Sequence, residues 1–123
     1  MSIKKRVLVV EDDAGILRFV KVALTTAGYD VITASGGEEA LELAQSKKPD
    51  LMLLDIFMSP MTGLEVLEKL RPTSQIPVIV FSARGSVVDE ALKRGANDFI
   101  AKPFKPEDLI EKIQSILDRK GAS

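Results

Sequence analysis

The chain has no cysteine, no histidine and no tryptophan among its 123 residues. Without cysteine there is no disulfide, no thiolate chemistry and no cysteine-based metal site. Without histidine there is no His base, no His nucleophile and no ordinary zinc site. The charged groups that remain are carboxylates, Lys and Arg, so a bound metal should be a hard, oxygen-seeking ion such as Mg²⁺.

An excess of charge of one sign is also lacking. The 17 Lys and Arg residues oppose 18 Asp and Glu residues, for a net charge of −1, which gives no reason to expect direct binding to nucleic acid or an anionic membrane. The apolar run that follows the basic start spans only residues 7–10, too short for an export signal or a membrane span. We therefore expect a cytoplasmic protein with no membrane partner. Its length predicts one domain over residues 1–123, with a core at about 6–117.

Short apolar runs without alternation predict strands buried on both faces, as in a parallel sheet. These runs are residues 7–10, 51–54 and 78–81, and weaker strands are predicted at 30–34 and 98–101. Helical spacing of apolar residues fills each interval and also the segment after the last strand. Capping-box spacing at Ser35/Glu38 and Thr62/Glu65 predicts two helix starts. The fivefold alternation predicts an α/β fold with helices on both faces of a parallel sheet.

Polar side chains follow four of the predicted strands, and in open α/β sheets ligands bind at that edge. They are Glu11, Asp12 and Asp13 after the first strand, Asp55 after the third, Ser82 after the fourth and Lys102 after the fifth. If the first and third strands are neighbours, several carboxylates converge and repel one another unless a cation intervenes. Mg²⁺, which takes one or two carboxylates and keeps several waters, would meet that demand.

Asp55 then has two possible roles, as a metal ligand or as a carboxylate nucleophile that attacks phosphorus and becomes an aspartyl phosphate. Lys102 and the Ser82 hydroxyl could hold the added phosphoryl oxygens. Each residue also has a plainer interpretation, since Asp13 suits a helix N-cap and Glu11 and Asp12 suit a loop. Only their occurrence together at one edge favours a functional site.

The same residues carry a resemblance to the receiver domain of two-component response regulators, over about residues 6–117. The motifs are the acidic pair Glu11-Asp12, the segment 53–58 around Asp55, Gly63, Phe81-Ser82-Ala83, the segment 95–99, and Lys102-Pro103-Phe104. The resemblance implies a doubly wound (βα)5 flavodoxin-like fold, with a five-stranded parallel sheet of order 2-1-3-4-5. It also implies that the chain is a phosphoacceptor, and an enzyme only towards its own phosphotransfer and dephosphorylation.

The resemblance implies a role for each site residue. Asp55 would be the phosphoacceptor, Asp12 would bind Mg²⁺ directly, and Glu11 would hold a metal-bound water. Asp55 itself and the backbone carbonyl of Phe57 would complete the protein's metal ligands. Lys102 would form an ion pair with the acceptor or its phosphate. The peptide bond between Lys102 and Pro103 would be cis.

On phosphorylation, Ser82 would turn to bond a phosphoryl oxygen and Phe99 would swing inward, although a strand position also suits Phe99 as a core residue. The surface around the fourth helix, fifth strand and fifth helix would be the output face. The phosphoryl donor would be a separate histidine kinase or phosphotransfer protein, because this chain has no histidine. The signal would pass to a downstream protein or to an output domain missing from this sequence. The resemblance also allows a dimer that forms on phosphorylation.

Several positions depart from the family's common pattern. Ser82 replaces a commoner threonine, Phe99 replaces a tyrosine, and Pro60 stands one place later than usual, after Ser59. The stretch from Ser82 to Gly95 is about two residues short, which affects the fourth helix or the loop before it. Phe57 and Arg84 occupy two variable positions beside the site, where an apolar group and a cation could shield the phosphoryl group from water. Slow self-dephosphorylation is the resulting hypothesis.

Three alternatives share parts of this pattern. A pseudo-receiver would use the same fold as an unphosphorylated interaction module. A Mg²⁺-dependent phosphohydrolase resembling the haloacid dehalogenase family would need an acid two residues past the nucleophile, where this chain has Phe57. A flavodoxin-like module would need a hydroxyl-rich loop after the first strand, where the anionic residues Glu11, Asp12 and Asp13 would repel a phosphate.

Overall fold

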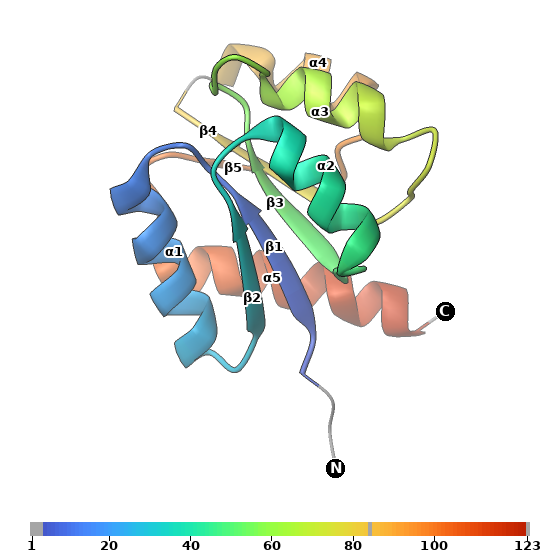
Figure 1. The fold of residues 1–123 in the computed structure, drawn as a ribbon. Coiled ribbons are helices and arrows are strands. Elements are labelled where there is room, and N and C mark those ends of the chain that lie inside the picture. Colours follow the sequence, from blue (N-terminus) through green and yellow to red (C-terminus); the bar gives the residue numbers. More distant parts are fainter. Residues whose placement is uncertain (1–3, 84, 123) are drawn as a thin grey trace.

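The computed structural model describes residues 4–83 and 85–122, with side chains up to residue 119. Strands and helices alternate along the described chain (Figure 1). The strands are β1 (Arg6–Val10), β2 (Asp30–Ala34), β3 (Leu51–Asp55), β4 (Val78–Ser82) and β5 (Asp98–Ala101). The helices are α1 (Ala14–Thr26), α2 (Gly37–Ser46), α3 (Gly63–Leu70), α4 (Val88–Lys93) and α5 (Pro106–Ala122), with a 3-10 turn (Gly85–Val87) before α4.

All five strands pair in parallel in the order β2-β1-β3-β4-β5, which confirms the predicted fold class. Helices α1 and α5 cover one face of the sheet, and α2, α3 and α4 cover the other (Figure 1). Alternate residues of β1 serve the two cores: Leu8 and Val10 pack under α2 to α4, whereas Val7 and Val9 pack under α1 and α5. This division explains the continuous apolar runs, because a strand covered on both faces buries every side chain.

Two of the three helix starts that the sequence indicates are found in the structure. Asp13 caps α1, its Oδ1 accepting from the Gly15 and Ile16 amides at 2.9 and 3.1 Å. Thr62 and Glu65 form the predicted capping box of α3.

The predicted box at Ser35 and Glu38 is wrong. The N-cap of α2 is Gly36, one residue later than predicted. Glu39 therefore lies three residues past the N-cap, where a carboxylate can accept a backbone amide that precedes the helix. Its Oε1 accepts the Ser35 amide at 2.9 Å.

Other boundaries shift by small amounts. Asp55 and Ser82 are the last residues of β3 and β4 rather than the first residues after them. Helix α5 extends from Pro106 to Ala122. No helix in residues 4–83 and 85–122 has the length and apolar character to cross a membrane.

Two loops at the carboxyl edge of the sheet contain cis peptide bonds. The Lys102–Pro103 bond is cis, the isomer that the resemblance implies. The Ser59–Pro60 bond is also cis, in the loop where the proline stands one place later than the family's common position.

Gly63 fits against the end of β3 so closely that a larger residue has no room. A Cβ at this position would lie 2.3 Å from the carbonyl oxygen of Asp55 and 2.8 Å from the Cα of Ile56. Both contacts are with backbone, which cannot move aside as a flexible side chain could. The Gly63 amide donates to the Ile56 carbonyl at 2.8 Å, so the loop after β3 closes on itself here.

We therefore expect Gly63→Ala to lower the free energy of unfolding by about 2 kcal/mol or more, because overpacking forces backbone shifts. Urea denaturation followed by circular dichroism measures this change. Gly85→Ala is the matched control, since a Cβ there would meet nothing within 4 Å. Equal stability of the two variants would contradict the packing argument.

Candidate functional site

The sequence-predicted polar residues meet at the carboxyl edge of the sheet, around a pocket of about 240 Å³. Its lining residues are Glu11, Asp12, Asp13, Ile16, Asp55, Phe57, Ala83 and Lys102. Glu11 continues the line of β1, its amide donating to the Ala34 carbonyl of β2 at 3.1 Å. Asp55 ends the neighbouring strand β3, so the pairing of β1 with β3 brings the two carboxylates together.

Lys102 joins these two carboxylates from the far end of the sequence. Its Nζ lies 2.8 Å from Oε1 of Glu11 and 3.2 Å from Oδ1 of Asp55. Glu11 is 1% exposed and Asp55 is 3% exposed, so both acids are removed from bulk water. The ammonium also lies 4.7 Å from the centre of the Phe81 ring, a contact that sequence reasoning missed because Phe81 looks like an ordinary strand residue.

Burial and crowding set the pKa values here. Burial, reinforced by a hydrogen bond with the Asp55 carboxyl, raises the pKa of Glu11 from 4.5 to about 7, while Lys102 opposes the rise. For Lys102, burial acts to lower the pKa, but the hydrogen bond with Glu11 and the charge of Asp55 outweigh it and raise the pKa. One ammonium thus faces two carboxyl groups, so the pocket has fewer basic than acidic groups.

Three of the carboxylates could share one cation. One oxygen each from Glu11, Asp12 and Asp55 lie within 4.8 Å of one another. Carboxylate oxygens are the donors that Mg²⁺ prefers, and Asp12 is exposed, which leaves room for metal-bound water. The donor set therefore fits a hard divalent cation.

The structure places the remaining predicted residues around this centre. Ser82 is buried at the end of β4, and its carbonyl accepts the Lys102 amide at 2.9 Å. Phe57 lines the pocket with 45% of its surface exposed. Phe99 is half-buried on β5 and packs against the core under α2 to α4. Arg84, the second variable position, lies outside the described residues.

Two further residues line the pocket without a polar group. Ile16 comes from the first turns of α1, and Ala83 follows Ser82. Neither side chain has a chemical group that would single it out in the sequence, because an apolar residue indicates a binding role only when its neighbours in space are known.

A family model described as the response regulator receiver domain matches residues 7–114. The probable transcriptional regulator ycf27 of Porphyra purpurea is 43% identical over 118 residues, covering 94% of this chain and 49% of that protein. The alkaline phosphatase synthesis transcriptional regulatory protein PhoP of Bacillus subtilis (strain 168) is 39% identical over 118 residues, with the same coverage. The chain thus spans about half the length of the curated relatives it matches.

Two solved structures match nearly all of this chain. A response regulator receiver domain protein (CheY-like) from Methanospirillum hungatei JF-1 has a TM-score of 0.91 and 34% identity, covering 98% of both chains. The Vibrio cholerae chemotaxis protein CheY4 has a TM-score of 0.87 and 34% identity, covering 92% of this chain and 98% of that one. Both likenesses therefore cover more than nine-tenths of this chain rather than a single motif.

The raised pKa of Glu11 predicts a pH dependence of stability. Between its ordinary value of 4.5 and about 7, the folded protein holds a proton that the unfolded chain has released. In metal-free buffer the free energy of unfolding should therefore fall as the pH rises through this window and then level off.

Urea denaturation at several pH values measures this slope, and Glu11→Gln should reduce it because the amide does not titrate. Glu42→Gln, an exposed position of α2, is the control that should leave the slope unchanged. Parallel profiles for the parent protein and Glu11→Gln would show that Glu11 does not carry the effect.

Proposed function

The chain belongs to the response regulator receiver domain family of two-component signalling, and from this premise we propose that it is a phosphorylation-controlled switch whose acceptor is Asp55. The observation that carries the proposal is the position of Asp55. Its carboxylate is buried at the end of β3, beside Glu11 and within 3.2 Å of the Lys102 ammonium. No other aspartate among the described residues is buried to this degree.

In the proposed reaction, a carboxylate oxygen of Asp55 attacks the phosphorus of a donor. The new oxygen–phosphorus bond forms as the donor's own bond to phosphorus breaks, and the donor leaves with that electron pair. Lys102 is close enough to pair with the phosphoryl oxygens that arrive at Asp55. Its cation then offsets charge that would otherwise build up among Glu11, Asp12 and the new phosphate.

Mg²⁺, when bound, would supply further positive charge to the phosphoryl oxygens. Glu11, Asp12, Asp55 and the backbone carbonyl of Phe57 would hold it, with Glu11 acting through a metal-bound water. The crowding of three carboxylates supports this assignment, because their repulsion favours a cation between them.

The donor would be a phosphohistidine on a separate kinase or phosphotransfer protein, since this chain has no histidine. The signal would pass to a downstream protein or to an attached output domain. The similar proteins that are transcriptional regulators are about twice as long as this chain, which supports an output domain as one destination. The balanced charge of the chain supports the proposal that it does not itself bind DNA.

Phosphorylation would shift an equilibrium between two conformations rather than build a new structure. Ser82 would bond a phosphoryl oxygen, and Phe99 would move further inward from its half-buried position on β5. The surface formed by α4, β5 and α5 would then change. The chain's own chemistry would be limited to accepting and losing the phosphoryl group.

Incubation with acetyl phosphate and Mg²⁺ tests the acceptor directly. We expect intact mass spectrometry to show one phosphoryl group per chain, which is not added when Mg²⁺ is chelated beforehand and is absent in Asp55→Asn. Asp89→Asn, an exposed aspartate of α4, is the control that should still accept the group. Phosphorylation of Asp55→Asn at the normal rate would refute the assignment of the acceptor.

Phe57 should slow hydrolysis of the phosphorylated protein, because its ring lines the mouth of the pocket and limits the approach of water. We expect Phe57→Asn to speed the loss of phosphate several-fold, an effect of about 1 kcal/mol on the barrier. The decay after removal of the phosphodonor, followed by mass, measures this rate. Leu92→Asn changes an equally exposed apolar residue of α4 and should leave the decay unchanged. An unchanged decay in Phe57→Asn would argue against shielding by this ring.

A further inference from the structure

The ring of Phe81 lies in the core directly beside the proposed phosphoacceptor. Phe81 belongs to β4 and is the register partner of Asp55 at the end of β3. It is fully buried and packs in the core under α1 and α5. A phenylalanine in this place would need no role beyond packing, but the Lys102 ammonium lies over its ring, 4.7 Å from the centre. The ring therefore contacts the basic group of the site as well as the core.

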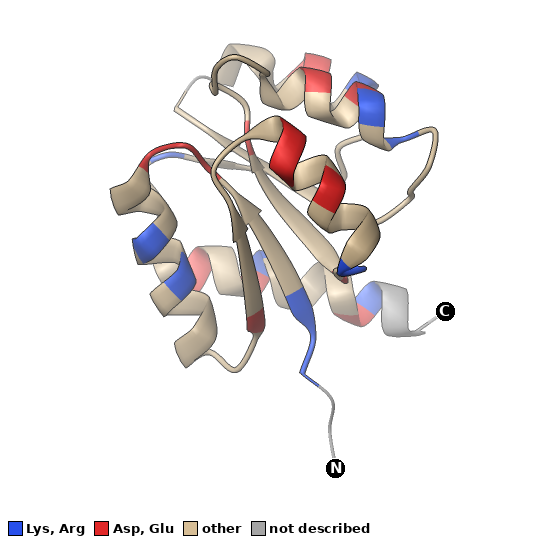
Figure 2. Ribbon diagram, in the orientation of Figure 1, with Lys and Arg blue, Asp and Glu red and all other residues tan. Residues whose placement is uncertain are grey.

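Lys102 is attached to β4 at both ends. Its backbone amide donates to the Ser82 carbonyl at 2.9 Å, and its Nζ lies over the ring of the preceding residue, Phe81. Between these two contacts is a flexible four-carbon stem that can adopt many rotamers. The contact with the ring selects among them. Figure 2 shows acidic positions directly after β1 and a basic position after β5 in this part of the molecule.

A second aromatic ring fixes the orientation of the first. The ring centres of Phe81 and Phe104 are 5.9 Å apart, with their planes at 86°. This edge-to-face arrangement is one of the two that aromatic pairs prefer. Phe104 stands two residues after Lys102, so the same loop contacts Phe81 twice, through the ammonium and through the second ring. The position of the lysine is thereby coupled to the orientation of the Phe81 ring.

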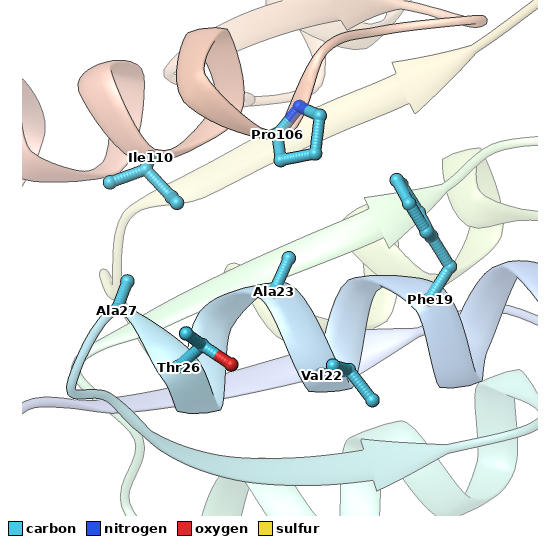
Figure 3. Close-up of a pocket in the computed structure, with 7 residues that line it drawn as sticks. All are labelled: Phe19, Val22, Ala23, Thr26, Ala27, Pro106 and Ile110. Carbon is cyan, nitrogen blue, oxygen red and sulfur yellow. The ribbon is translucent and has the colours of Figure 1, made fainter.

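The surroundings of this contact are apolar. A pocket of about 280 Å³ beside it is lined by Ile16, Phe19, Ala83, Lys102, Pro103 and Phe104. Phe19 also lines an apolar groove between α1 and α5 (Figure 3). The Lys102 side chain is only 18% exposed. A cation is held over a ring more strongly when it is partly desolvated in this way than at an open surface.

We propose that Phe81 is a positioning residue, which keeps the Lys102 ammonium at the acceptor while its hydrogen-bond partners change. The inference rests on the proposed function of Asp55. In the unphosphorylated protein, Nζ donates to Glu11 at 2.8 Å and to Asp55 at 3.2 Å. An arriving phosphoryl group competes for these donors, so the ammonium must turn. Attraction to the ring face depends on the whole charge of the ammonium rather than on one N–H group, and it persists through this exchange.

The NMR spectrum of the full chain tests the contact without any phosphoryl group. Protons above an aromatic face are shifted upfield, so the ε-methylene protons of Lys102 should resonate upfield of those of exposed lysines. Phe81→Leu should abolish this shift. Ile79→Ala, which removes the same number of carbon atoms from the same core, should retain it. A parent protein without the shift, or a shift that survives Phe81→Leu, overturns the proposal.

The rate of phosphorylation by acetyl phosphate and Mg²⁺, followed by intact mass, tests the role. We expect Phe81→Leu to lower this rate about tenfold. Ile79→Ala should react near the parent's rate, although urea denaturation should show a similar loss of stability. Replacing Phe81 with para-fluorophenylalanine and then with pentafluorophenylalanine keeps an apolar ring but withdraws electron density from its face. The rate should fall in that order, which a residue that only packs would not produce.

The outcomes separate this inference from the proposed function. A parent protein that is phosphorylated, with Phe81→Leu and both fluorinated forms reacting at the parent's rate, overturns the positioning role and leaves Asp55 as the acceptor. Equal slowing in Ile79→Ala also overturns it, because lost packing then explains the effect. A parent protein that accepts no phosphoryl group overturns the proposed function and the role in phosphotransfer with it, and the ring-current shift then decides separately whether Phe81 holds the lysine.

Discussion

The burial of the Glu11 and Asp55 carboxyl groups beside each other is the constraint on which the rest of the site depends. Two carboxylates at 1% and 3% exposure repel each other strongly, and neither can be screened by bulk water. Lys102 offsets part of this repulsion from the other end of the chain, 91 residues from Glu11 and 47 from Asp55. The structure therefore maintains a local excess of negative charge that a proton, a metal ion or a bound group can relieve.

The sheet order imposes this approach. Because β1 and β3 pair in parallel at the centre, their carboxyl ends must deliver Glu11 and Asp55 to the same place. Gly63 lets the loop after β3 close tightly, and Asp13 fixes the start of α1 beside the pocket. A module that used this fold only to bind other proteins would have no need of the buried acid pair, whereas a phosphoacceptor does. The phosphohydrolase alternative also lacks its second acid, since Phe57 stands there.

The sequence contained most of the fold and the polar part of the site. Continuous apolar runs identify strands buried on both faces, and Asp55 and Ser82 directly follow two of these runs, so both could be selected without a structure. The first residue of α2 was harder to predict, because Ser35 and Gly36 are both acceptable N-caps. The choice between them depends on which backbone amide the Glu39 carboxylate can reach. The ring of Phe81 under Lys102 and the groove at Phe19 depend on residues distant in sequence, and periodicity carries no record of such contacts.

Chemical location of the phosphoryl group tests the account most directly. Borohydride reduces an acyl phosphate to an alcohol, so an aspartyl phosphate becomes homoserine in the peptide that carried it. After phosphorylation and reduction, peptide mapping should find homoserine at position 55 and unmodified carboxylates at Glu11 and Asp12. Reduction at Glu11 or Asp12, or a phosphorylated protein with no reducible acyl phosphate, would contradict the claim that the buried end of β3 is the acceptor.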